Sequence, residues 1–144
     1  MQDEVWSELD ALAEGRRVLV LTTIGWHRRS RDATVARYDA STSKARANLP
    51  SGVVPIVLRG AGETMFWLPE VGALVPGDRL LGDGDGGVRI CPDSWLRYLK
   101  GSIDGAQLRV LLAPLLDLPV ERILTSHGEP VLSRGREALA RALA

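Results

Sequence analysis

The chain has 144 residues, of which 45% are hydrophobic and 25% charged, as expected for one globular domain over residues 1–144. The formal net charge is zero, which gives no reason to expect a nucleic-acid or anionic-membrane partner. Cys91 is the one cysteine, so an internal disulfide is excluded and a cytoplasmic location is expected. No apolar run approaches the roughly 18 residues of a membrane span, and the acidic N-terminus is unlike a signal peptide.

The first part of the chain predicts helices around one short strand. Val5, Leu9 and Leu12 share a helix face at spacings of four and three, and Gly15 ends that helix. Ser30 is of a residue type that caps helix N-termini. We therefore expect helices over 3–14, 31–38 and 43–49, with a buried strand over 18–23.

The remainder predicts a β-rich stretch followed by helices. Strands are expected over 53–58, 63–68, 72–75, 88–90 and 120–125, and helices over 92–99, over 104–116 and from Ser133 to Ala144. The acidic segment 83–87 is similar to a calcium loop, but Ser94 stands where the loop needs a bidentate acid. It is therefore interpreted as a hairpin turn. The order of elements indicates an α/β layered fold.

Two polar motifs come directly after predicted strands. Gly77-Asp78 follows the strand over 72–75, and Ser126-His127-Gly128-Glu129-Pro130 follows the strand over 120–125. Loops at strand ends are where α/β layered folds place metal ligands and catalytic groups. Asp78 and His127 are therefore the first candidate site residues.

Together with Phe66–Pro69 and Ala73–Pro76, these motifs resemble the last two metal-binding motifs of the metallo-β-lactamase fold. The resemblance spans nearly the whole chain and implies an α/β/β/α layered sandwich. It also implies that Asp78 would bridge two metals and His127 would bind the second. The family has strands before the first motif, so we expect an N-terminally incomplete domain, with those strands dispensed with, lost, or supplied by a second copy in a homo-oligomer.

The earlier ligand positions of the family are mostly replaced. In its first motif, His-x-His-x-Asp-His, Thr23 and Gly25 stand for the first two histidines, His27 for the aspartate and Arg28 for the last histidine. The next ligand position falls near Arg59. The resemblance therefore implies a hydrolase-like protein with a degenerate metal site and weak or absent activity, a pseudoenzyme.

Three hypotheses follow from these residues. In the first, His27, Asp78 and His127 hold one Zn²⁺ or Fe²⁺ ion, and His27 and Asp78 are catalytic in hydrolysis of an ester, thioester or lactone. In the second, no metal binds, and Arg28 and Arg59 neutralise Asp78 and bind an anionic small molecule. In the third, the domain is a scaffold that is stable only as an oligomer.

Structural explanations exist for the same residues. Asp78 could cap a turn and His127 could be a hydrogen-bonded loop residue. Glu63 could replace a missing ligand, but the first residue of a strand is more often exposed. The tryptophans are expected in the core or an interface, and Cys91 is expected to be buried and inert.

Overall fold

The computed structural model describes residues 3–28, 30–43, 49–101 and 103–144. Its helices are α1 (Asp3–Ala13), α2 (Arg31–Tyr38), α3 (Asp93–Leu96), α4 (Gly105–Leu112) and α5 (Gly135–Leu143), with 3-10 turns η1 (Pro69–Val71) and η2 (Ala113–Asp117). Its strands are β1 (Leu19–Val20), β2 (Ser41–Thr42), β3 (Val54–Leu58), β4 (Glu63–Leu68), β5 (Ala73–Val75), β6 (Leu80–Gly82), β7 (Val88–Ile90) and β8 (Arg122–Ile123).

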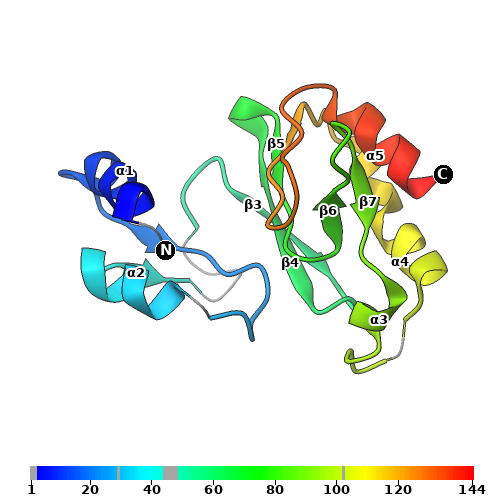
Figure 1. Cartoon of the computed structure of the whole chain (residues 1–144), viewed down its shortest axis with the longest axis horizontal. Helices are drawn as coiled ribbons and strands as arrows, with labels where there is room; N and C mark the ends of the chain where they lie inside the picture. The colour runs from blue at the N-terminus through cyan, green and yellow to red at the C-terminus, as the bar shows by residue number, and fades with distance from the viewer. Residues whose placement is uncertain (1–2, 29, 44–48, 102) are drawn as a thin grey trace.

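The largest sheet has the strand order β3-β4-β5-β8. Its first three strands are antiparallel, with Trp67 of β4 opposite Val54 and Leu74, and β8 runs parallel to β5. The hairpin β6-β7 forms a second sheet, and α5 packs on β7. Figure 1 shows α4 and α5 together on the β7 side of the molecule, with the β3-β4-β5 sheet beyond the hairpin. The described elements therefore form a layered α/β arrangement.

One continuous apolar core lies between these layers. Met65, Leu74 and Ile123 of the large sheet and Leu112 and Leu139 of the helices are all fully buried in it. Helix α4 starts at a capping box in which the side chains of Asp104 and Gln107 satisfy each other's backbone N–H groups. The short helices and strands around the site depend on this core for their stability, since isolated segments of this length are marginal in water.

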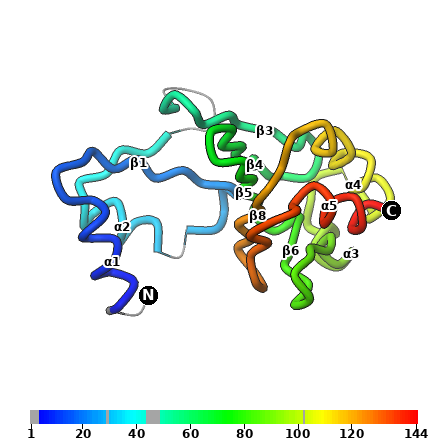
Figure 2. Tube along the Cα trace, turned by 90° about the horizontal axis from the view of Figure 1, so that it is seen from above, coloured from blue at the N-terminus to red at the C-terminus, as the bar shows by residue number. Residues whose placement is uncertain are grey.

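Residues 3–28 and 30–43 form an N-terminal lobe that lies to one side of this core (Figure 2). The lobe holds α1, α2 and the parallel pair β1-β2, and none of its described residues belongs to the core cluster. It is joined to the large sheet where the Thr64 N–H donates to the Thr23 carbonyl at 2.9 Å. Ile24, only 1% exposed, is buried beside this junction. The junction places the following residues, 25–28, next to the large sheet.

The two helices of the lobe are held together by Asp10. Its carboxylate accepts hydrogen bonds from Arg37 Nε at 2.7 Å and from the Tyr38 hydroxyl at 2.9 Å. The Arg37 guanidinium also lies 5.0 Å from the centre of the Trp6 ring. The hydrogen bonds from Arg37 and Tyr38 lower the pKa of Asp10 to about 2.

This lowered pKa predicts a pH-dependent contact between α1 and α2. The ionised form of Asp10 is the one that the folded lobe favours, so the contact is complete above the ordinary pKa of about 4 and weakens as the pH falls toward 2. We expect the indole N–H resonance of Trp6 to shift over that interval in the native protein. In Asp10→Asn the shift should be absent, and an unchanged shift in that variant would assign it to another group.

Most predicted elements are confirmed, with shorter bounds. The helix over 31–38, the strands over 63–68 and 88–90 and the hairpin turn between β6 and β7 lie where expected, while β1 and β8 are two-residue strands. The helix expected over 104–116 changes to a 3-10 turn after Leu112, at Pro114. The helix expected over 43–49 falls mainly on residues 44–48, outside the described residues.

Of the two predicted serine caps, one is in place and one is wrong. Ser30 is the N-cap residue of α2 as predicted, although its side chain makes no capping hydrogen bond. The N-cap of α5 is Arg134, with a left-handed φ of 56°, and not Ser133. Strand β6 was not predicted, because two leucines and a glycine between two turns are too few to show a period.

In the described part of the chain, no helix is both long and apolar enough to cross a membrane.

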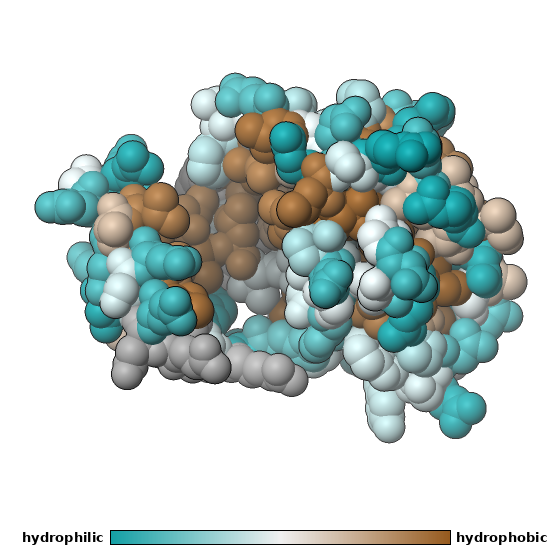
Figure 3. Space-filling view, turned by 45° about the horizontal axis from the view of Figure 1, so that its top comes forward, coloured by the Kyte–Doolittle hydropathy of each residue, from teal (hydrophilic) through white to brown (hydrophobic). Residues whose placement is uncertain are grey.

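Figure 3 shows apolar surface gathered between the N-terminal lobe and the rest of the molecule. The homo-oligomer stays a prediction.

Candidate functional site

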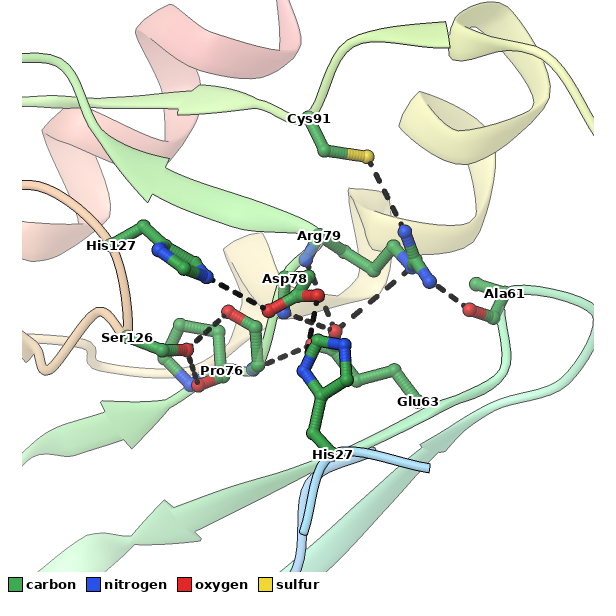
Figure 4. A network of polar contacts seen from close by, with 10 residues as sticks. His27, Ala61, Glu63, Pro76, Asp78, Arg79, Cys91, Ser126 and His127 are labelled. Carbon is green, nitrogen blue, oxygen red and sulfur yellow. Dashed lines mark hydrogen bonds and ion pairs between the residues drawn. The ribbon is translucent and has the colours of Figure 1, made fainter. Parts of the chain in front are cut away.

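Three loops bring the candidate residues together beside one carboxylate. His27 follows the turn in which its N–H donates to the Ile24 carbonyl, Asp78 follows β5, and His127 follows β8. Nδ1 of His27 lies 3.5 Å from Oδ2 of Asp78, and Nε2 of His127 lies 3.4 Å from Oδ1. Figure 4 shows the Asp78 carboxylate between the two imidazoles. The structure therefore brings His27, Asp78 and His127 together from three distant segments. The metal-binding and catalytic roles of these residues stay predictions.

The Asp78 carboxylate is nearly buried while both imidazoles are open to solvent. Its side chain is 11% exposed, against 45% for His27 and 41% for His127. The separations of 3.4–3.5 Å exceed ordinary hydrogen-bond lengths but lie within the range of an ion pair. Each carboxylate oxygen of Asp78 therefore has an imidazole nitrogen beside it.

The donor set suits a metal in kind, since two imidazoles and a carboxylate are common zinc and iron ligands. The arrangement does not fit one. Each imidazole nitrogen approaches a different oxygen of Asp78, and within the described ranges no group of three or more His, Cys, Asp or Glu side chains is placed to hold an ion. The three side chains therefore do not form a metal centre in this arrangement.

A buried glutamate holds the loop that carries Asp78. Glu63 is 3% exposed, and its carboxylate accepts the backbone N–H groups of Gly77, Asp78 and Arg79 at 2.9, 2.7 and 3.0 Å. A Cβ on Gly77 would lie 2.8 Å from Glu63 Oε2, so only glycine allows this approach. The expectation that Glu63 is exposed is wrong, because these three donors satisfy the carboxylate in the interior.

Arg79 is a buried cation that sequence analysis missed. Its side chain is 2% exposed, Nε donates to the Ala61 carbonyl at 2.9 Å and lies 4.0 Å from Glu63 Oε2. A terminal guanidinium nitrogen lies 3.7 Å from the sulfur of Cys91, which is buried as expected. Burial raises the pKa of the Cys91 thiol, and burial also raises the pKa of Glu63 against the opposing effect of its N–H donors and Arg79. Glu63 and Arg79 therefore form a buried polar cluster that holds the backbone at Asp78.

Two glycines and a serine fix the loop that carries His127. The Gly82 N–H donates to the His127 carbonyl at 2.9 Å, and the Ser126 hydroxyl donates to the Gly77 carbonyl at 2.7 Å. A Cβ on Gly82 would lie 2.2 Å from the Glu129 carbonyl oxygen, and Gly128 has a φ of +74°. The β6 backbone therefore lies directly against this loop, which a side chain at Gly82 would prevent.

These polar groups open onto a pocket with aromatic walls. The pocket has a volume of about 570 Å³, and its lining consists of Trp26, His27, Asp78, Arg79, Trp95, Tyr98 and His127. The Trp95 ring meets the His127 ring edge to face, with 5.7 Å between centroids. Trp26 and Tyr98 are 58% and 90% exposed, so the rings of both side chains are accessible to a ligand. Of the four tryptophans, Trp67 lies in the core as expected, whereas Trp26 and Trp95 line the pocket.

The two arginines of the metal-free hypothesis lie elsewhere. Arg28 lines a second cavity, and Arg59 is an exposed residue of the turn between β3 and β4. Among the described residues, the ion pairs of Asp78 are with His27 and His127 alone. The predicted pairing of an arginine with Asp78 is therefore not formed, because imidazoles occupy both sides of the carboxylate.

No family model matches the sequence, and no curated protein matches it at a significant level. Solved structures match nearly the whole chain at low identity. The crystal structure of VMB-1 at pH 5.5 has a TM-score of 0.62 and 13% identity, covering 99% of this chain and 74% of its own. TMB-1 has a TM-score of 0.58 and 11% identity, covering 98% and 72%. A metallo-β-lactamase from Erythrobacter litoralis has a TM-score of 0.50 and 15% identity, also covering 98% and 72%.

These neighbours are metallo-β-lactamase-fold proteins, and the chain has this fold. The α/β layered fold predicted from the motifs around Asp78 and His127 is confirmed. The likeness extends to architecture alone, so the chemistry of the site has to be argued from the side chains that this chain carries.

Proposed function

We propose that this chain is a hydrolase-like pseudoenzyme that binds a small molecule in the aromatic-walled pocket, with weak or absent hydrolase activity. The observation that carries the proposal is the orientation of the imidazoles in Figure 4, which approach opposite oxygens of Asp78 and do not share a centre. The pocket beside them has exposed aromatic rings that can stack on a ligand. Binding of a small molecule in this pocket is thus supported more strongly than metal-dependent hydrolysis.

The chemistry that remains is proton transfer at the two imidazoles. Asp78 can orient them and stabilise an imidazolium, which is the role of a carboxylate beside a catalytic histidine. A nucleophile beside them is missing from the described residues. The Ser126 hydroxyl is committed to the Gly77 carbonyl, and Cys91 is buried with a raised pKa. Any hydrolysis would therefore use water and would be slow.

The first test is metal content together with hydrolysis. Protein purified without chelator or affinity-tag metal should contain little zinc or iron by elemental mass spectrometry, even after reconstitution. Activity on aryl esters, thioesters and lactones should be weak and insensitive to EDTA, because no step needs an ion. Stoichiometric metal together with EDTA-sensitive turnover would overturn the proposal.

The second test is ligand binding. Aryl esters should quench tryptophan fluorescence in a saturable way, since Trp26 and Trp95 line the pocket. Trp95→Phe should reduce the amplitude of quenching, because one of the two fluorescent side chains in the pocket is lost. The phenylalanine ring still lines the pocket. Trp6→Phe, in the N-terminal lobe, is the matched control and should leave the titration midpoint unchanged. Equal midpoints in all three proteins, with no loss of signal in Trp95→Phe, would place binding outside this pocket.

A one-metal hydrolase is the second candidate. It is favoured by the donor types of His27, Asp78 and His127, which lie 3.4–3.5 Å apart in two histidine–aspartate pairs but do not converge on one point in this structure. This candidate requires a small rotation that turns both imidazoles toward one point. It predicts bound metal that is lost in His127→Ala, which the metal analysis measures directly.

A further inference from the structure

The segment from Gly25 to Arg28 lines two different cavities. Trp26 and His27 line the aromatic-walled pocket, whereas Gly25 and Arg28 line a second cavity of about 530 Å³. The two sets of lining residues have no member in common among the described residues. The second cavity is therefore a separate candidate site on the other side of this segment.

Cations and hydroxyl groups dominate the polar lining of the second cavity. Its cations are Arg28 and Arg31, placed one turn apart by the hydrogen bond from the Arg31 N–H to the Arg28 carbonyl. Its hydroxyl-bearing residues are Thr22, Thr23, Ser43 and Thr64. Hydroxyls and guanidinium groups are the donors that proteins use for oxyanions.

The positive charges of this cavity are poorly balanced. Among the described residues Arg28 has no ion pair, and Arg31 has one, a 3.8 Å contact with the exposed Asp32. The carboxylate that lines the cavity, Glu63, is already used by three backbone N–H groups and by Arg79. Two arginines that line one cavity place two positive charges beside it, so both would attract an anion bound there.

Arg31 also carries an unused donor. Its Nε atom is buried and has no hydrogen-bond partner in the described part of the chain. A buried N–H without an acceptor is costly, and native structures rarely leave one unless a ligand or water supplies the acceptor. This unpaired donor belongs to one of the two arginines that line the second cavity.

We propose that the second cavity binds an oxyanion, the phosphate or carboxylate group of a small molecule or a free inorganic anion. Arg28 and Arg31 supply charge-assisted hydrogen bonds, and the hydroxyl groups complete the donors around the anion. This assigns anion recognition to Arg28 together with Arg31, in place of the predicted pair of Arg28 and Arg59. It does not depend on the function proposed for the aromatic-walled pocket.

The test is calorimetric titration with inorganic phosphate against sodium chloride at equal ionic strength. The native protein should bind phosphate at one saturable site, and Arg28→Gln and Arg31→Gln should each weaken it by about tenfold or more. Arg89→Gln, on the exposed side of β7, is the matched control and should leave the affinity unchanged. No binding, or equal weakening in all three variants, would overturn the proposal.

A second readout covers the case in which Arg31→Gln does not fold. Phosphate should shift the Nε–H resonance of Arg31 in the native protein, and an unshifted resonance at saturation would also overturn the proposal. Titrations with phenyl phosphate and with acetate then distinguish the possible sources of the bound anion. Tighter binding of phenyl phosphate than of phosphate indicates a group on a larger ligand, and equal binding indicates a free anion.

Discussion

Replacing Glu63 by glutamine is expected to lower the free energy of unfolding by about 3–5 kcal/mol, the range for removing one member of a buried charge pair. The native carboxylate accepts three backbone N–H groups and faces Arg79, whose side chain is 2% exposed. Glutamine has one acceptor oxygen, and its NH₂ group would meet N–H donors while Arg79 lost its counter-charge. Chemical denaturation of the variant beside the native protein measures the loss.

Glu70→Gln is the matched control for this prediction. Glu70 is exposed in η1, so the same change of chemistry there should alter stability by less than about 0.5 kcal/mol. The loop of Asp78 gives a second readout, because its three N–H groups should exchange with solvent faster in Glu63→Gln than in the native protein. A stable variant with unchanged exchange would show that Glu63 does not hold the Gly77–Arg79 loop.

The fold could be predicted because its signals are local. Glu63–Leu68 and Val88–Ile90 are bounded by glycine and proline turns, and Asp78 and His127 each follow a strand that the apolar pattern marks. Sequence position alone placed these two residues at strand ends, and the layered sheets bring those ends together. His27 was identified differently, from the resemblance of residues 23–28 to the first metal-binding motif of the metallo-β-lactamase fold.

The support beneath Asp78 could not be predicted, because it depends on contacts between distant residues. Glu63 and Arg79 are both of types that are usually exposed, and only the folded chain shows that they satisfy each other and three N–H groups in the interior. The direction of a side chain after a turn is equally hidden from the sequence. Arg28 was expected at Asp78 and lies instead in the second cavity, one residue after His27.

Replacing Gly82 by alanine is expected to displace His127 and to lower the free energy of unfolding by about 1–3 kcal/mol, as overpacking a close contact does. The added Cβ would lie 2.2 Å from the Glu129 carbonyl oxygen and 2.6 Å from the Glu129 nitrogen. Both are backbone atoms, so the loop has to move as a whole, and the hydrogen bond from the Gly82 N–H to the His127 carbonyl is strained.

The displacement should be visible in the His127 imidazole, whose resonances are shifted by the ring of Trp95 at 5.7 Å in the native protein. In Gly82→Ala that ring-current shift should decrease, and aryl-ester quenching should weaken with it because the pocket loses one wall. Gly25→Ala is the matched control for stability, since a Cβ there meets nothing within 4 Å and its φ is not positive. If both variants were equally stable and the His127 resonances did not move, the close contact between β6 and the loop would not be what positions His127. In that case Ser126, through its hydrogen bond to the Gly77 carbonyl, would remain as the element that ties this loop to Asp78.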